Sequence, residues 1–221
     1  MYIKNDPVKR LYRVLFLLLC TTGIVLQYAI VARIGSPKML SCYYTIQSNV
    51  LCLVYFAGLL VCQPKRENPM VKGLVMLGIV ITGLVYHFML NGAMEAGVGA
   101  VAEVTFTEVL ANTLVHYVVP LMTVGDYLLF APKGGYRWMD PLKWLSLPAL
   151  YVVFVMIRAQ VDSGLFAGFS GKSRYPYPFV DVDLYGVGMV CLMVGAILLA
   201  FWVLGMAIVG LDHLMGRAAK Q

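Results

Sequence analysis

The fold is decided by residues 108–130, EVLANTLVHYVVPLMTVGDYLLF. At ~1.5 Å per residue, a helix of this length crosses the hydrocarbon core of a bilayer. Yet the stretch contains polar side chains, and a charged residue at the centre of a span costs ~2.5–3.5 kcal/mol. Glu108, Asn112 and His116 follow one another at i, i+4 and i+8, so they share one helical face. The stretch therefore predicts a transmembrane helix whose polar face points into a helical bundle.

The composition of the whole chain is that of a membrane protein. Of its 221 residues, 61% are hydrophobic and 13% charged, whereas soluble domains are ~45–50% apolar and ~25% charged. The apolar residues come in long runs separated by short polar joints. These patterns predict an all-α polytopic protein, with residues 1–221 forming one domain of six transmembrane helices. We place the six spans at 11–32, 42–62, 71–92, 107–130, 142–161 and 184–211.

The basic residues predict the orientation of the bundle. The formal net charge is +6, but lysine and arginine gather at the joints between spans rather than on one amphipathic face, which argues against a nucleic-acid partner. If the N-terminus is cytoplasmic, 12 of the 17 basic residues lie on the cytoplasmic side and 5 on the other. The positive-inside rule then predicts a multi-pass protein of the plasma (inner) membrane with both termini in the cytoplasm.

The cysteines and the N-terminal residues show no motif for a metal site, a disulfide framework or a cleaved signal peptide. None of the five cysteines forms a CxxC motif or a cluster with histidine, so we expect buried free thiols, no metal and no disulfide framework. The first apolar run, 11–31, is too long for a cleaved signal peptide and reads as a retained span. No common catalytic fingerprint of soluble enzymes is present, and no cofactor is implied.

A second polar cluster lies at the start of the second span, in 42–49, CYYTIQSN. Thr45, Ser48 and Asn49 stand at i, i+3 and i+4 and share a face. The structural interpretation is that the threonine bonds a carbonyl one turn back and that Asn49 and Gln47 join helices. The functional interpretation is that Thr45 is a nucleophile, which requires a neighbouring base to take its proton.

Histidine is the side chain best suited to that role, because its pKa is nearest to working pH. With the predicted orientation, Thr45 and His116 both fall in the outer half of the bundle. The alternative is that His116 is a neutral imidazole satisfied by a neighbouring helix. His87, near the outer end of the third span, could line the same cavity, but no companion spacing supports a metal site.

Three motifs together resemble a known family. They are 44–49 (YTIQSN), the fourth span with Asn112, His116, Pro120 and Asp126, and 175–179 (YPYPF). They resemble the Pr6Pr family of bacterial six-helix integral membrane proteins. More distantly, they resemble the animal androgen-induced membrane proteins, threonine hydrolases that cleave fatty acid esters of hydroxy fatty acids.

The resemblance implies a six-helix fold and a hydrolase in which Thr45 and His116 are the catalytic pair. It also implies a role for Tyr177 and Phe179, which fall in a Tyr-Pro-Phe-aliphatic-acid motif before the last span. Both lie on the predicted outer side, as Thr45 and His116 do.

Together these features predict an intramembrane hydrolase of lipid or fatty-acid esters. Thr45 would attack the ester carbonyl, His116 would act as general base, Asn112 would orient the imidazole, and Asn49 would stabilise the oxyanion. The other residues expected to support the cavity are Gln47, Ser48, His87, Tyr177 and Phe179. The expected partners are the bilayer and a lipid or fatty-ester substrate, and no oligomeric state follows from the sequence. The alternatives are a non-enzymatic lipid- or amphiphile-binding protein or transporter, and a structural subunit whose cavity is filled by side chains.

Overall fold

The computed structural model describes residues 6–34, 36–90, 105–166 and 173–218. Within these ranges the chain forms helices and no strand. Six helical segments are long and apolar enough to cross a membrane, which confirms the all-α, six-helix prediction. The last two residues of the predicted third span, 91 and 92, lie outside the described residues. The six segments are Asp6–Arg33, Tyr44–Cys62, Pro69–Leu90, Phe106–Phe130, Asp140–Val161 and Val182–Ala218.

Several of the spans are composite. The third and fourth each contain a π-helical turn, and the fifth is broken at Leu145. The last carries a non-helical residue, Gly186 (φ 73°, ψ 160°), near its start. The elements in chain order are α1 (Asp6–Ile34), α2 (Pro37–Ser41), α3 (Tyr44–Cys62), α4 (Pro69–Val85), η1 (Tyr86–Leu90), α6 (Phe106–Thr113), η2 (Leu114–Val118), α7 (Val119–Phe130), α8 (Asp140–Trp144), α9 (Ser146–Val161), η3 (Pro178–Val180) and α10 (Val182–Ala218).

Local signals in the sequence start two of these helices. The Asn68 side chain accepts hydrogen bonds from the first turn of α4, and Pro69 occupies its first position, where a missing N–H costs nothing. Thr105 and Glu108 form a reciprocal capping box at the start of α6. Glu108 therefore serves as a helix cap.

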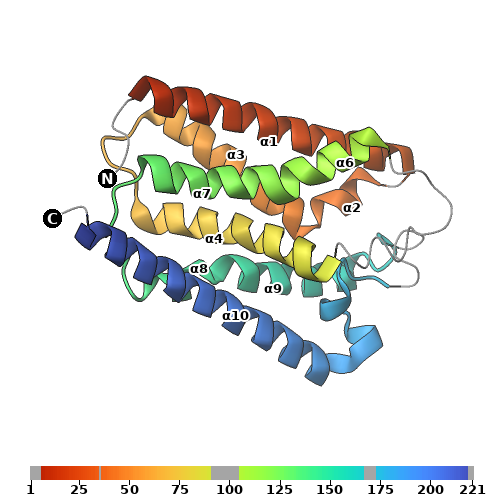
Figure 1. Ribbon diagram of the computed structural model, residues 1–221. Coiled ribbons are helices and arrows are strands. Elements are labelled where there is room, and N and C mark those ends of the chain that lie inside the picture. The colour runs from red at the N-terminus through yellow and green to blue at the C-terminus, as the bar shows by residue number, and fades with distance from the viewer. Residues whose placement is uncertain (1–5, 35, 91–104, 167–172, 219–221) are drawn as a thin grey trace.

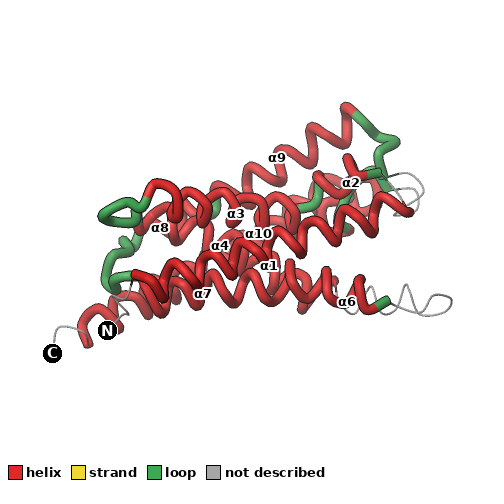
Figure 2. Tube along the Cα trace, turned by 90° about the horizontal axis from the view of Figure 1, so that it is seen from above, coloured by secondary structure: helices red, strands yellow, loops and turns green. Residues whose placement is uncertain are grey.

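The helices pack as a central set with a flank. Helix α1 packs against α3, α6 and α7, and α4 packs against α3, α7 and α8. Helix α10 contacts α8 and η3 and crosses the flank of the bundle (Figure 1). Helix α1 begins and α10 ends at the same end of the bundle (Figure 1), which we call the terminal end. Toward the opposite end, α6 and α9 diverge (Figure 2).

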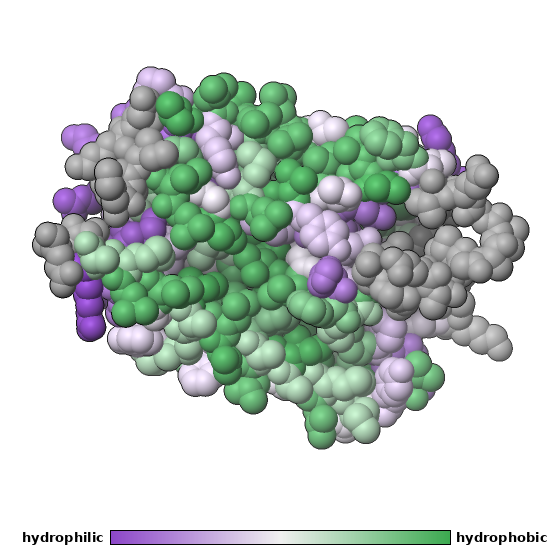
Figure 3. Space-filling model, in the orientation of Figure 1, coloured by the Kyte–Doolittle hydropathy of each residue, from purple (hydrophilic) through white to green (hydrophobic). Residues whose placement is uncertain are grey.

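The surface of the bundle is suited to lipid. In the most apolar 18-residue stretch of α10, only 11% of the residues are buried. Large apolar side chains along this helix are exposed. In the space-filling view the middle of the molecule is largely hydrophobic, while hydrophilic residues gather at the terminal end (Figure 3). Exposed apolar area on this scale needs a covering medium. The six apolar helices indicate that this medium is a lipid bilayer.

Three buried charged residues and the partly buried Glu67 nevertheless meet near the terminal end, in what we call the four-charge cluster: Arg13, Glu67, Lys72 and Asp126. Arg13 contacts Asp126 at 2.8 Å and Glu67 at 2.6 Å. Lys72 contacts the same two carboxylates, at 2.5 and 2.7 Å. Two cations thus neutralise two anions, and the cluster joins α1, α4, α7 and the loop before α4. Asp126 is a structural member of this cluster: it lies ten residues after His116 in the same span, and its side-chain partners are Arg13 and Lys72.

Candidate active site

Thr45 and His116 are hydrogen-bonded to each other across the bundle. Thr45 lies in the first turn of α3 and His116 in η2, yet Thr45 Oγ1 and His116 Nε2 are 3.3 Å apart. The imidazole is buried, with 7% of the residue exposed. The two residues singled out from separate motifs are therefore neighbours.

The other ring nitrogen fixes the tautomer of His116. Nδ1 lies 3.1 Å from the main-chain carbonyl oxygen of Asn112, one turn earlier. A carbonyl oxygen only accepts hydrogen bonds, so Nδ1 carries the proton and Nε2 presents a lone pair. The Thr45 hydroxyl then donates to Nε2. This is the arrangement of a nucleophile with its general base.

The π-turn that carries His116 is held by two close helix contacts. A Cβ atom on Gly83 of α4 would lie 2.8 Å from the main-chain oxygen of His116, and a Cβ on Gly23 of α1 would lie 2.9 Å from Leu114 Cβ. Only glycine permits approaches this short. Pro120 adds to the irregularity, because it has no N–H to offer the His116 carbonyl. π-turns of this kind are frequent at functional sites.

Two further residues, which no sequence motif singled out, contact the His116 ring and the Asn112 side chain. Tyr86, at the start of η1, stacks on the His116 ring with centroids 3.8 Å apart and planes inclined by 13°. Gln27 of α1 donates through Nε2 to the Asn112 side-chain oxygen at 2.8 Å. A polar Gln27 within an otherwise apolar predicted span was a usable signal, whereas the stacking of Tyr86 depends on the tertiary structure.

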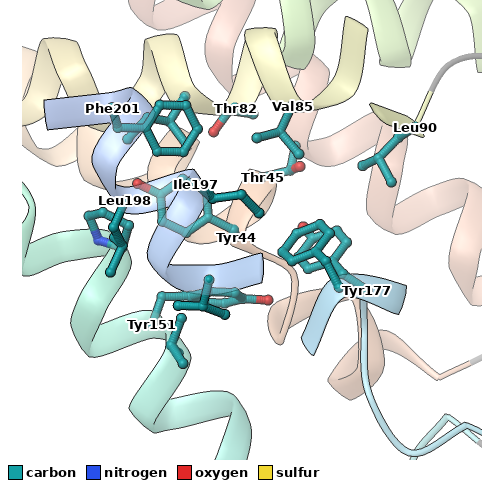
Figure 4. A pocket seen from close by; sticks show the side chains of 15 residues that line it. Tyr44, Thr45, Thr82, Val85, Leu90, Tyr151, Tyr177, Ile197, Leu198 and Phe201 are labelled. Atoms are coloured by element: carbon teal, nitrogen blue, oxygen red, sulfur yellow. The ribbon is translucent and has the colours of Figure 1, made fainter. Parts of the chain in front are cut away.

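Thr45 and His116 face a cavity of about 290 Å³ at the end opposite the terminal end. Its wall is mainly apolar, and its other polar members include Gln27, Asn112 and Tyr177. On the far side of Thr45 lies a second, smaller cavity of about 60 Å³ between α4, α9 and α10 (Figure 4). Thr45 and Tyr177 line both cavities, so the hydroxyl of Thr45 stands between two apolar spaces.

Tyr177 belongs to the site because it lines both cavities beside Thr45. Burial raises the pKa of this phenol to about 12. The phenol therefore keeps its proton at neutral pH and can donate it in a hydrogen bond. Phe179 stacks on the Tyr177 ring, with centroids 5.2 Å apart, and lines the smaller cavity.

Asn49 and Asn112 make contacts other than those expected from the sequence. Asn49 is fully buried, and its amide nitrogen already donates to the carbonyls of Thr45 (2.7 Å) and Val115 (3.2 Å). Both N–H groups are thus committed, one within α3 and one across to η2, and neither is free for an oxyanion. Asn112 does orient the imidazole, but through its main-chain carbonyl, while its side chain meets Gln27.

Three other expected residues point away from both cavities. Gln47 donates to the carbonyl of Ser41 at 3.2 Å. Ser48 bonds the Thr82 hydroxyl at 2.7 Å, which joins α3 to α4. His87 is exposed, and its Nδ1 lies 3.2 Å from the Tyr117 hydroxyl. Their partners hold these side chains in structural contacts. For Gln47 and Ser48, sharing a short motif with Thr45 did not bring them to its cavity.

The site offers no evident place for a metal. In the part of the chain that the structure describes, no three His, Cys, Asp or Glu residues gather in a way that could hold a metal ion. The five cysteines are free thiols.

Comparisons of the chain with protein-family models, curated proteins and solved structures found no match. The resemblance to the Pr6Pr and androgen-induced membrane proteins therefore stays a prediction. The function of this protein must therefore be inferred from the geometry of the site.

Proposed function

We propose that this protein is an intramembrane hydrolase of lipid or fatty-acid esters, with Thr45 as nucleophile and His116 as general base. The observation that carries the proposal is the contact of 3.3 Å between Thr45 Oγ1 and an imidazole nitrogen whose partner nitrogen is fixed by the Asn112 carbonyl. If both side chains served only helix packing, no cavity would be needed beside them. A cavity of about 290 Å³ lies against both, which favours a role in binding or chemistry.

In the first half of the reaction, Thr45 Oγ1 attacks the ester carbonyl carbon as its proton passes to His116 Nε2. The carbonyl π electrons move to oxygen and form a tetrahedral oxyanion. Collapse of this intermediate breaks the bond to the alcohol oxygen, which takes the proton from Nε2 and leaves. The products are the free alcohol and an acyl ester on Thr45.

In the second half, water attacks the acyl carbon and gives its proton to Nε2. Collapse then expels Thr45 Oγ1, which takes that proton back, and the carboxylic acid is released. Oxygen, protons and electron pairs balance with water as the co-reactant. His116 serves in turn as base and acid in each half, which its neutral Nδ1-protonated tautomer allows.

We assign stabilisation of the oxyanion to Tyr177 in place of Asn49. Tyr177 lines both cavities beside Thr45, at the start of α3. Its phenol is protonated at neutral pH, and the first N–H groups of a helix add a positive dipole end. Loss of one donor at such a position typically costs ~2.7–4 kcal/mol of transition-state stabilisation.

The apolar walls favour a substrate with hydrocarbon chains. Residues of α4, α9 and α10 line the smaller cavity, including Val85, Ile197 and Phe201 (Figure 4). A fatty ester with its carbonyl at Thr45 would have apolar space on both sides, and the bilayer would supply it sideways. The distribution of basic residues supports a plasma-membrane location, with this site in the outer half and both termini in the cytoplasm.

A second candidate is a non-enzymatic protein that binds or transports a lipid or small amphiphile. It is favoured by one observation: the amide of Asn49, the side chain closest in sequence to Thr45 that could bind an oxyanion, is already fully used. In that case the same cavity would hold the ligand without a covalent step.

A serine/threonine-directed fluorophosphonate probe separates the two functions. Purified wild type should label in detergent, and Thr45→Ala and His116→Ala should each abolish labelling while keeping the helical circular dichroism spectrum. Thr123→Ala is the matched control, since the Thr123 hydroxyl bonds its own helix at Val119 O (2.8 Å) and lines neither cavity of the site, and it should label normally. Folded wild type that does not label would favour the binding protein.

A further inference from the structure

A third cavity lies at the terminal end, far from Thr45, where α1 and α3 meet the loop before α4. Its volume is about 230 Å³, and its wall is mainly polar. The cations that line it are Lys9, Arg10, Arg13 and Lys65, and the anions are Asp6 and Glu67. In an apolar bundle, a polar cavity of this size at one end of the spans requires an explanation.

Two of these charges already neutralise other groups. Arg13 and Glu67 belong to the four-charge cluster, in which two cations face two carboxylates. Burial alone would raise the pKa of Glu67, but Lys72 and Arg13 hold that pKa below its usual value. Glu67 is therefore ionised at neutral pH and the cluster is neutral. The remaining wall has three cations, Lys9, Arg10 and Lys65, against one anion.

The excess positive charge is not matched by anions among the described residues. Lys9 pairs with Asp6 at 3.3 Å, but Arg10 and Lys65 form no ion pair within the described ranges. Arg10 is instead held in place by the Gln63 side-chain oxygen at 2.6 Å. Gln63 ends α3 with a left-handed backbone (φ 43°), a conformation that costs a non-glycine residue energy. The cavity is thus bounded by a strained residue that positions a guanidinium.

We propose that this cavity binds a phosphate-bearing anion. A guanidinium and two ammonium groups around a pocket of this size match the charge and the hydrogen-bond acceptors of a phosphate. Basic pockets between transmembrane helices on the cytoplasmic side are suited to anionic lipid headgroups, and the positive-inside rule predicts that side for the terminal end. Leu11 on α1 and Val61 on α3 are 71% and 82% exposed, so apolar surface for acyl chains begins beside the cavity. The site does not depend on the proposed hydrolase activity.

Thermal unfolding in dodecyl maltoside tests the proposal. We compare micelles with an equal mole fraction of phosphatidylglycerol or phosphatidylcholine, and lipid-free micelles with added inorganic phosphate. We expect phosphatidylglycerol to raise Tm by about 2–4 °C more than phosphatidylcholine does, and the difference to shrink at high salt. A rise with inorganic phosphate equal to that with phosphatidylglycerol would support the same chemistry and identify the soluble ion as its source.

The variant Arg10→Gln/Lys65→Gln should lose this extra stabilisation. Both side chains are exposed, so the fold should persist, and Lys65→Gln alone provides a milder version of the same test. The matched control is Arg137→Gln, an exposed arginine on the same predicted side but outside the cavity, which should respond as wild type does. The proposal is overturned if neither phosphatidylglycerol nor phosphate stabilises wild type, or if the double variant responds like the control.

Discussion

Two clusters of buried polar residues lie in this bundle, and they are built differently. In the four-charge cluster each cation contacts two carboxylates, and no member is left for a ligand. At the opposite end, Thr45 and His116 satisfy each other but stand on the wall of a cavity. In the four-charge cluster all charged groups are paired within the protein. The Thr45–His116 pair instead places a hydroxyl and a basic nitrogen beside an apolar cavity.

The difference separates stability from function among polar residues inside a membrane. Polar groups in a span are costly, so each needs either a partner or a task. Removing a member of the four-charge cluster should therefore damage the fold, and removing a member of the Thr45–His116 pair should damage chemistry. The following predictions are ordered from the largest expected effect to the smallest.

Asp126→Ala should be the most destabilising change. It leaves Arg13 and Lys72 buried with one carboxylate between them, and breaking a buried ion pair in this way costs ~3–5 kcal/mol. Thermal unfolding in detergent measures the loss. Asp6→Ala is the control, because Asp6 forms an exposed ion pair with Lys9 worth ~1 kcal/mol or less. Equal stability of the two variants would mean that the four-charge cluster does not hold the helices together.

Tyr177→Phe should impair chemistry and spare the fold. Loss of the phenolic donor beside Thr45 is expected to slow fluorophosphonate labelling or ester hydrolysis by about 10²-fold, while the buried ring and its stacking on Phe179 remain. Tyr175→Phe, on the same loop but lining neither cavity of the site, should react at the wild-type rate. If both variants react alike, Tyr177 does not stabilise the oxyanion.

Gly83→Ala should disturb the site through the backbone. The added methyl group would lie 2.8 Å from the His116 main-chain oxygen, so η2 must shift, and overpacking of this kind costs ~1–3 kcal/mol. Labelling should fall because the His116 ring moves with its backbone. Gly58→Ala, where a Cβ meets nothing within 4 Å, should keep labelling and gain up to ~1 kcal/mol of stability. Normal labelling of Gly83→Ala would show that the close contact is not needed.

Thr45→Ala should have the smallest effect on stability. It removes one hydrogen bond, worth ~0.5–1.5 kcal/mol, and the Asn49 contacts to main-chain carbonyls remain. A stability loss comparable to that of Asp126→Ala would mean that Thr45 is a packing residue after all.

The sequence was sufficient for the fold and for the central pair of the site. Long apolar runs with polar joints predict six spans, because a bilayer permits few alternatives. The polar face of the fourth span and the cluster at the start of the second pointed to His116 and Thr45. Depth along the helix axis placed both in the same half of the bundle, which allowed their contact, but the contact itself depends on how the helices pack.

The supporting residues were harder to predict, because rotation about the helix axis and main-chain geometry decide them. Ser48 and Gln47 are near Thr45 in sequence, but helical rotation turns them toward α4 and α2. The contribution of Asn112 comes from its carbonyl, which every residue has. The π-turn at His116 and the stacking of Tyr86 arise from helix packing that no local motif encodes.

The most direct test of the central claim is to locate the fluorophosphonate adduct in labelled wild-type protein by peptide mapping and tandem mass spectrometry. The account predicts a single adduct on Thr45 Oγ1. An adduct on Ser48, on Thr82 or on any other residue would contradict it, and so would a folded protein that carries no adduct.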